Sequence, residues 1–258
     1  MDQPSLGFVG GGRAATIILG GLNRAERRPR RVVVSDPSAA ALEELRRRVP
    51  RIAVTSDNAM AAACDVVFLA VHPPVIPAVA GGLAPHLRPD TVVISLAPKV
   101  TLAGLAELFG GFGRLARVIP NAPSIVGAGY NPVCFGPGVD ATTREVVLEL
   151  LSALGACPQV AEADLETYAI LTAMGPTYLW FQLYELLDLG TSFGLGHEDA
   201  RRALQAMVEG TLTTMEQSGL TAAEVMDLVA VRPLGDEEAS ILGLYRSKLP
   251  ALLARLRP

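Results

Sequence analysis

Three small residues near the amino terminus have the types and spacing of a dinucleotide-binding loop. Gly10, Gly12 and Ala15 follow a short apolar run at residues 6–9 and open a segment with helical character. Gly10 would let the chain turn sharply off a strand, Gly12 would leave the backbone open to a diphosphate, and Ala15 would let the helix pack closely. The free amides and positive dipole end of that helix would face the diphosphate. The pattern predicts a dinucleotide site, although glycines of this kind also serve plain strand–helix turns.

A carboxylate follows the next predicted strand, which spans residues 31–35. Asp36 lies roughly 20 residues beyond Ala15, where an acid meets the adenosine ribose of a bound dinucleotide. It favours NADH over NADPH, because a carboxylate binds two ribose hydroxyls and repels a 2′-phosphate. Arg13 at the turn would partly neutralise such a phosphate, so NADH and NADPH both stay candidate cofactors.

The composition narrows the class of protein. The chain has 258 residues, 50% of them hydrophobic, enough for one large domain or two of ordinary size. Its net charge of −4 argues against a nucleic-acid partner. No apolar run reaches the roughly eighteen residues of a membrane-spanning helix, and residues 1–4 lack the basic start of a secretory signal. The cysteines lack metal-like or redox-like spacing, so we expect a cytoplasmic protein without a bound metal.

The elements that would position these residues alternate between strands and helices up to about residue 160. Continuous apolar runs are typical of parallel strands buried on both faces. Residues 65–71 form such a run, further strands are expected at residues 6–9, 31–35, 91–95 and 117–119, and a last strand is expected near 157–160. The alternation predicts a doubly wound, mostly parallel α/β sheet. Ligands of such sheets bind at the carboxyl ends of the strands.

From Asp164 onward the pattern is helical. We expect one long helix over residues 167–193, in which Pro176 marks either a kink or the first turn of a new helix. Further helices are expected over 198–217, from the Thr221 capping box, and over 237–256. Apolar residues lie on more than one face of the long helix, which predicts burial by its own domain or by a second chain. We therefore expect a dinucleotide-binding domain over residues 1–162, an all-helical domain over 163–258, and a homodimer built through the helices.

The order of these motifs resembles that of the pyrroline-5-carboxylate reductase family over nearly the whole chain. His72 stands where the family usually has lysine. The segments similar to family motifs are residues 8–15, 69–73, 95–97, 100–102, 119–123, 126–129 and 175–178, with Glu185.

The resemblance implies an amino-terminal Rossmann domain, a carboxy-terminal all-α dimerisation domain, and hydride transfer from NAD(P)H to the C=N bond of 1-pyrroline-5-carboxylate, which yields proline. The implied cofactor-binding residues are Gly10, Gly12, Arg13, Ala14, Ala15, Asp36, Ala70, Val71, His72, Pro73, Ala97 and Asn121. The implied substrate-binding residues are Asn121, Gly175, Pro176, Glu185, Arg232 and Gly235. His72 contacts the cofactor in one interpretation and is only solvated in the other.

The substrate loop departs from the family pattern. The family has a serine-proline-glycine-glycine-threonine-threonine loop, and Asp236 and Glu237 here replace its threonine pair. Two carboxylates would repel a substrate carboxylate by on the order of several kcal/mol in a partly dry site, and a bidentate contact from Arg232 would offset this. A cationic or carboxylate-free cyclic imine is therefore a second candidate substrate.

The same acids suggest a proton donor, because the imine nitrogen must be protonated as its carbon receives hydride. A buried acid with a raised pKa would supply that proton. Asp236 and Glu237 are the candidates, with Tyr178 and Glu185 behind them. Alternatively, the acids only cap the last helix, where carboxylates are favourable.

Other functions compatible with the sequence keep the cofactor and change the chemistry. One is a reductase of the β-hydroxyacid dehydrogenase or deazaflavin-dependent type. The first of these would need a catalytic lysine on the long helix, and no lysine lies between Lys99 and Lys248. Another is a dinucleotide-binding protein that has lost its chemistry.

Overall fold

The computed structural model describes residues 3–26 and 29–257. The chain forms two compact units. The first contains the residues up to Met174 together with the segment that begins at Leu252, and the second contains Gly175–Ala251. The domain division expected at 162/163 stays a prediction. Among the described residues, no helix combines the length and apolarity that crossing a bilayer requires.

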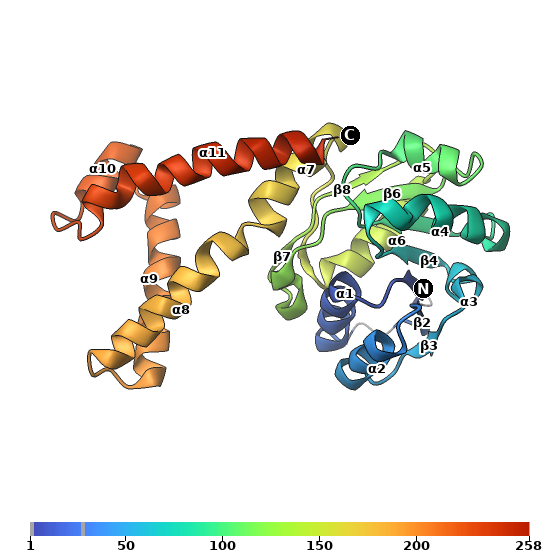
Figure 1. The fold of residues 1–258 in the computed structure, drawn as a ribbon, viewed down its shortest axis with the longest axis horizontal. Helices are drawn as coiled ribbons and strands as arrows, with labels where there is room; N and C mark the ends of the chain where they lie inside the picture. Colours follow the sequence, from blue (N-terminus) through green and yellow to red (C-terminus); the bar gives the residue numbers. More distant parts are fainter. Residues whose placement is uncertain (1–2, 27–28, 258) are drawn as a thin grey trace. The chain divides into compact units, whose positions relative to one another are not determined.

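The first unit is built on a seven-stranded sheet (Figure 1). Its strands are β1 (Ser5–Val9), β2 (Arg31–Ser35), β3 (Ala53–Thr55), β4 (Val66–Leu69), β5 (Val92–Ser95), β6 (Leu115–Val118) and β8 (Val133–Phe135). The spatial order is β3-β2-β1-β4-β5-β6-β8, and only the β6–β8 pair is antiparallel. This confirms the predicted doubly wound, mostly parallel sheet. The order reverses between β1 and β4, which opens a crevice at their carboxyl ends.

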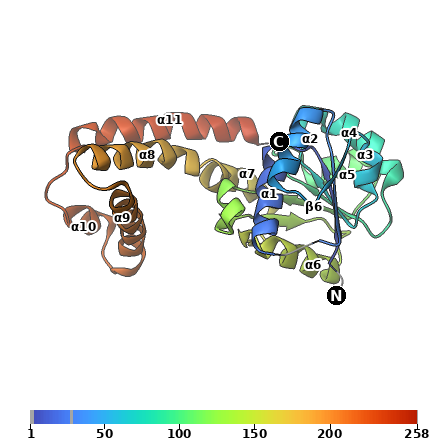
Figure 2. The ribbon, with the colours of Figure 1, turned by 90° about the horizontal axis from the view of Figure 1, so that it is seen from below.

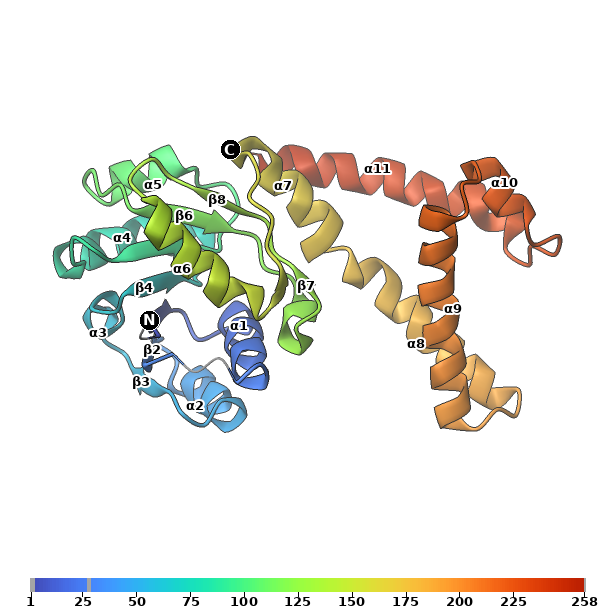
Figure 3. The same ribbon diagram turned by 180° about the vertical axis from the view of Figure 1, so that it is seen from behind.

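Helices cover both faces of this sheet (Figures 1 and 3). They are α1 (Arg13–Arg24), α2 (Ala39–Arg48) and α6 (Ala141–Ser152) on one face, and α3 (Asn58–Ala62), α4 (Ile76–Leu83) and α5 (Leu102–Leu108) on the other. Successive strand residues face opposite sides, so Phe8 and Val34 belong to the first core and Val9 and Val33 to the second. The apolar runs of the strands are explained by this burial on both sides.

The expectation that a strand near residues 157–160 completes the main sheet is wrong. Strand β9 (Gly155–Ala156) pairs with β7 (Gly129–Tyr130) in a separate two-stranded sheet. Beyond it, a single bridge joins Gln159 to Val133. Pro158 has no N–H to continue a ladder, and its carbonyl accepts from Val133 at 2.9 Å.

The second unit is helical (Figure 2). It contains α8 (Pro176–Ser192), α9 (His197–Gln217), α10 (Ala222–Asp227) and most of α11 (Glu238–Leu256), whose last residues belong to the first unit. The predicted capping box of Thr221 and Glu224 is confirmed. Among residues 175–251, all of which the structure describes, Ala200 alone is buried.

The expectation of one continuous helix over residues 167–193 is wrong, and the alternative that Pro176 opens a new helix is confirmed. The chain forms α7 (Leu165–Tyr168), a π-helical turn (Ala169–Ala173) and then α8. Pro176 lacks the N–H that would reach the carbonyl of Thr172 four residues earlier. That carbonyl instead accepts from the side-chain amide of Asn121 at 3.3 Å. The interruption is therefore compensated by a contact from a distant part of the chain.

Candidate functional site

The turn between β1 and α1 has the conformation and the open space expected of a diphosphate site. Gly10 has φ of 104°, and a Cβ there would lie 2.5 Å from the carbonyl oxygen of Ala70, so only glycine fits. Gly12 has an ordinary φ of −78°, and a Cβ there would meet nothing within 4 Å. No side chain caps α1, and no acid lies in its first turn. The amides of Arg13, Ala14 and Ala15 thus form an uncapped helix terminus that fits the diphosphate of a dinucleotide.

Asp36 ties the end of β2 to this turn. Its Oδ2 accepts from the backbone N–H of Gly11 at 2.8 Å, and its Oδ1 accepts from that of Ser38 at 2.8 Å. A carboxylate has further lone pairs for a ligand hydroxyl. The structure brings Asp36 to the glycine turn, and its contact with a ribose stays a prediction.

The ends of β4 and β5 join the same edge of the sheet. The N–H of Ala70 donates to Val9 at 2.8 Å, and the N–H of Leu96 donates to Leu69 at 3.1 Å. These bonds bring Val71, Pro73 and the buried Ala97 to the edge where β1 ends. His72 is exposed, and its side chain caps no helix. Its contact with a cofactor stays a prediction.

Asn121 is held as the two flanking prolines suggest, but its amide faces protein atoms. Its Nδ2 donates to the carbonyl of Thr172 at 3.3 Å. Its Oδ1 accepts from the N–H of Tyr130 at 3.1 Å and from the hydroxyl of Ser124 at 3.3 Å. The side chain therefore organises the loop after β6, and its expected ligand contacts stay predictions.

A buried ion-pair cluster near this edge was missed from the sequence. Arg117 of β6 is fully buried and donates to Glu162 at 2.9 Å and to Glu166 at 2.5 Å. Glu166 is 2% exposed, and Nε of Arg117 is buried without a partner among the described residues. One signal was available. Arg117 is a lone charge within an apolar strand, and a buried charge needs an opposite charge nearby.

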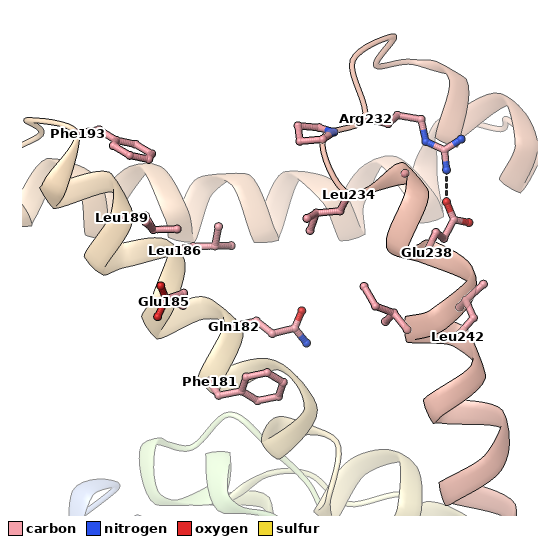
Figure 4. A pocket seen from close by; sticks show the side chains of 13 residues that line it. Phe181, Gln182, Glu185, Leu186, Leu189, Phe193, Arg232, Leu234, Glu238 and Leu242 are labelled. Atoms are coloured by element: carbon pink, nitrogen blue, oxygen red, sulfur yellow. Dashed lines mark hydrogen bonds and ion pairs between the residues drawn. The ribbon is translucent and has the colours of Figure 1, made fainter.

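In the second unit, three of the expected substrate residues line one groove (Figure 4). The groove has a volume of about 1160 Å³, and its walls come from α8, α11 and the loop that precedes α11. Glu185, Arg232 and Gly235 line it among mostly apolar side chains. Arg232 forms an ion pair with Glu238 at the same groove.

The remaining expected residues of this unit lie elsewhere. Gly175 and Pro176 form the start of α8, and neither lines the groove. Tyr178 packs edge-on against Tyr245 with ring centroids 5.9 Å apart, and burial raises its pKa.

The two candidate acids precede α11 and do not line the groove. Asp236 and Glu237 are both exposed in the turn Gly235–Glu237. Neither carboxylate is covered by another described part of the chain. Their role as proton donors stays a prediction, as does the alternative that they only cap the last helix.

The described residues contain no group of three histidine, cysteine or acidic side chains placed to hold a metal ion.

Comparison with known proteins identifies relatives of the whole chain. A pyrroline-5-carboxylate reductase of Corynebacterium melassecola is 31% identical over 246 residues, which cover 94% of this chain and 91% of the relative. That of Pseudomonas aeruginosa is 28% identical over 98% of this chain and 93% of the relative. Residues 5–99 also match the family described as NADP oxidoreductase, coenzyme F420-dependent.

Solved structures share the fold. A pyrroline-5-carboxylate reductase from Coxiella burnetii superposes with a TM-score of 0.75 at 27% identity, covering 99% of this chain and 98% of that one. The pyrroline carboxylate reductase of Plasmodium falciparum with NADP bound gives a TM-score of 0.75 at 22% identity, over 99% and 95% of the two chains. The likeness extends through both compact units.

Proposed function

Because the chain belongs to the pyrroline-5-carboxylate reductase family, we propose that it reduces the C=N bond of a cyclic imine with NADH or NADPH. The observation that carries this proposal is the uncapped start of α1 behind Gly12, at the point where the strand order reverses. When bound, the reduced nicotinamide supplies the hydride that the imine carbon receives. Isothermal titration of the purified protein with NADH and NADPH tests the proposal, and binding of neither would refute it.

The first unit offers a place for each part of the cofactor. The amides of Arg13, Ala14 and Ala15 would hold the diphosphate, with the Arg13 guanidinium beside it. Asp36 would bind the adenosine ribose. Residues that follow Asp36 in the sequence line a depression of about 480 Å³, among them Ser56, Asn58 and residues of α4. The adenine would bind in this depression.

The nicotinamide would lie at the ends of β4, β5 and β6. The residues proposed to line it are Ala70, Val71, His72, Pro73, Ala97 and Asn121. Among these, Ala70 and Ala97 follow strands that neighbour each other in the sheet. The hydride face would then lie in the crevice at the carboxyl edge of the sheet.

We propose that NADH is preferred over NADPH. Asp36 would accept from the ribose hydroxyls and would repel a 2′-phosphate. Steady-state kinetics with both cofactors test this, and a lower KM for NADPH than for NADH would overturn it. If NADPH is preferred, the Arg13 guanidinium is the candidate partner of its 2′-phosphate.

The substrate is 1-pyrroline-5-carboxylate or a related imine, and the product of the first is proline. The ion pair between Arg232 and Glu238 favours the related imine without a carboxylate, because Glu238 already binds the guanidinium to which a substrate carboxylate would bind. Asp236 and Glu237 add negative charge on the same loop. Turnover of 1-pyrroline-5-carboxylate and of 1-pyrroline, measured side by side with saturating cofactor, separates the two candidate substrates.

The proton for the imine nitrogen is proposed to come from Asp236 or Glu237, with Tyr178 and Glu185 as further candidates. Both acids are exposed in one chain, so a second molecule would have to bury them. Glu237→Gln should lower turnover and remove a limb of the pH profile. An unchanged profile would exclude Glu237 from this role.

A homodimer through the second unit would supply that burial. Phe181 and Tyr184 of α8 are each 68% exposed, Phe193 directly after α8 is 81% exposed, and the groove beside this helix is mostly apolar. Sedimentation should show a dimer at micromolar concentration. Phe181→Asp should weaken it, and Val75→Asp on the first unit should not. A wild-type monomer would reject the proposal.

We place the enzyme in the cytoplasm. Its three cysteines, Cys64, Cys134 and Cys157, are all free. Free thiols suit a reducing compartment. Fractionation of the native host with an antibody to the chain tests this placement.

A further inference from the structure

The carboxylates that neutralise Arg117 also hold the loop that leaves β5. Glu166 Oε1 accepts from the backbone N–H of Lys99 at 3.3 Å. Glu162 Oε1 accepts from the backbone N–H of Leu102, the first residue of α5, at 2.6 Å. Residues 96–102, which include Ala97, are thus held by the buried Glu166 of α7 and by the partly buried Glu162 of the turn before it.

The loop needs this support, because its backbone is strained. Lys99 has φ of 74°, a left-handed conformation that a residue with a Cβ rarely adopts. Such a conformation persists only where the surroundings hold it. The hydrogen bond from Lys99 to Glu166 is one contact that does so, and the Arg117 guanidinium in turn fixes Glu166.

A further hydrogen bond joins the segment over residues 162–173 to the chain that follows β6. Asn121 donates to Thr172, and Thr172 lies in the π-helical turn that follows α7. The segment over residues 162–173 therefore contacts the chain after β5 and the chain after β6. The nicotinamide is proposed to lie beside the carboxyl ends of both of these strands.

We propose that Arg117 and Glu166 are positioning residues for the nicotinamide end of the cofactor. They act through the backbone of residues 96–101 and need not touch the cofactor. The inference rests on the proposed function, because it requires the nicotinamide to lie beside Ala97. The diphosphate and the adenosine belong to the Gly12 turn and to Asp36, which are parts of other elements.

Because separate elements would hold the two ends of the cofactor, we expect a variant of Glu166 to affect two kinds of ligand differently. A change at Glu166 should weaken a ligand that carries the nicotinamide ring and leave a ligand without the ring unaffected. A residue that only supports the fold would weaken both ligands alike. The comparison therefore separates positioning from general stability.

The test uses isothermal titration of the full-length protein with NADPH and with 2′-phospho-ADP-ribose, which lacks the nicotinamide. NADH and ADP-ribose replace them if NADH is the tighter ligand. Glu166→Ala should raise the Kd for the reduced cofactor by about tenfold, which corresponds to roughly 1.4 kcal/mol of binding free energy. The Kd of the nicotinamide-free ligand should stay within about twofold. Glu166→Gln retains an oxygen acceptor for the Lys99 amide and should recover most of the loss.

The matched control is Asp140→Asn. Asp140 pairs with Arg114 at 2.8 Å, and Arg114 immediately precedes β6, at the opposite end of that strand from the proposed site. This variant removes an ion pair from the same unit and should bind both ligands as the wild type does. If Glu166→Ala does not fold, Glu162→Ala takes its place, because Glu162 is only partly buried and holds the Leu102 amide.

Two results would overturn the inference. One is an equal loss of both ligands in the variants, and the other is no loss of either. A wild-type protein that binds neither ligand would instead refute the proposed function, so the two failures are distinguishable.

Discussion

Gly12→Ala should separate ligand binding from folding at the glycine turn. Gly12 has φ of −78°, which alanine adopts without strain, and the added Cβ would meet nothing within 4 Å. The residue caps α1, where alanine is less favourable than glycine by about 0.5–1 kcal/mol. We therefore expect only a small loss in the free energy of unfolding.

The same methyl group should interfere strongly with the cofactor. It would stand in the open space through which a diphosphate reaches the amides of α1. Loss of one charge-assisted hydrogen bond costs about 1.5–3 kcal/mol. At 1.4 kcal/mol for each factor of ten, the Kd for NADH or NADPH should rise by about 10- to 100-fold.

Two glycine variants complete the experiment. Gly10→Ala would place a Cβ 2.5 Å from the carbonyl oxygen of Ala70 at φ of 104°, so it should lower the melting temperature sharply. Gly81→Ala in α4 faces open space and should stabilise the fold by about 0.5–1 kcal/mol with unchanged binding. Cofactor titration and thermal unfolding measure both effects. Binding by Gly12→Ala within twofold of the wild type would refute the reasoning.

Three further perturbations test other parts of the fold. A backbone amide of α6 and the guanidinium of Arg114 lower the pKa of Asp140 from 3.8 to about 2. A depressed pKa stabilises the fold above the unfolded value, so the melting temperatures of the wild type and Asp140→Asn should differ at pH 6 and converge as pH falls from about 4 to 2; a constant gap would contradict this. Burial raises the pKa of Cys157 to about 12 and of Cys134 to about 11, so a disulfide reagent at pH 8 should label them only after denaturation, and rapid labelling of the native protein would be the contrary result. Leu151→Ala in the core should lower the free energy of unfolding by about 2–5 kcal/mol in urea, and a loss below about 1 kcal/mol would argue against close packing there.

Local pattern alone was enough to predict the alternating architecture and the glycine turn. Strands buried on both faces are continuously apolar, and a helix that begins at a capping side chain shows it within one turn, so residues a few positions apart reveal both. The capping box at Thr221 and the mostly parallel sheet were predictable for this reason. The turn at Gly10 was predictable because only glycine tolerates the conformation and the contact found there.

Contacts between distant residues were decided by the tertiary structure. Arg117 meets Glu162 and Glu166 across 45 and 49 residues, and Asn121 meets Thr172 across 51. No short-range periodicity encodes which acid will neutralise a buried arginine, because the pairing depends on how β6 and α7 pack. The interrupted helix before α8 has the same origin, since its free carbonyl is satisfied by a side chain from another element. The sequence alone determined which residues could bind a dinucleotide, and the packing of remote elements decided which of them are free to do so.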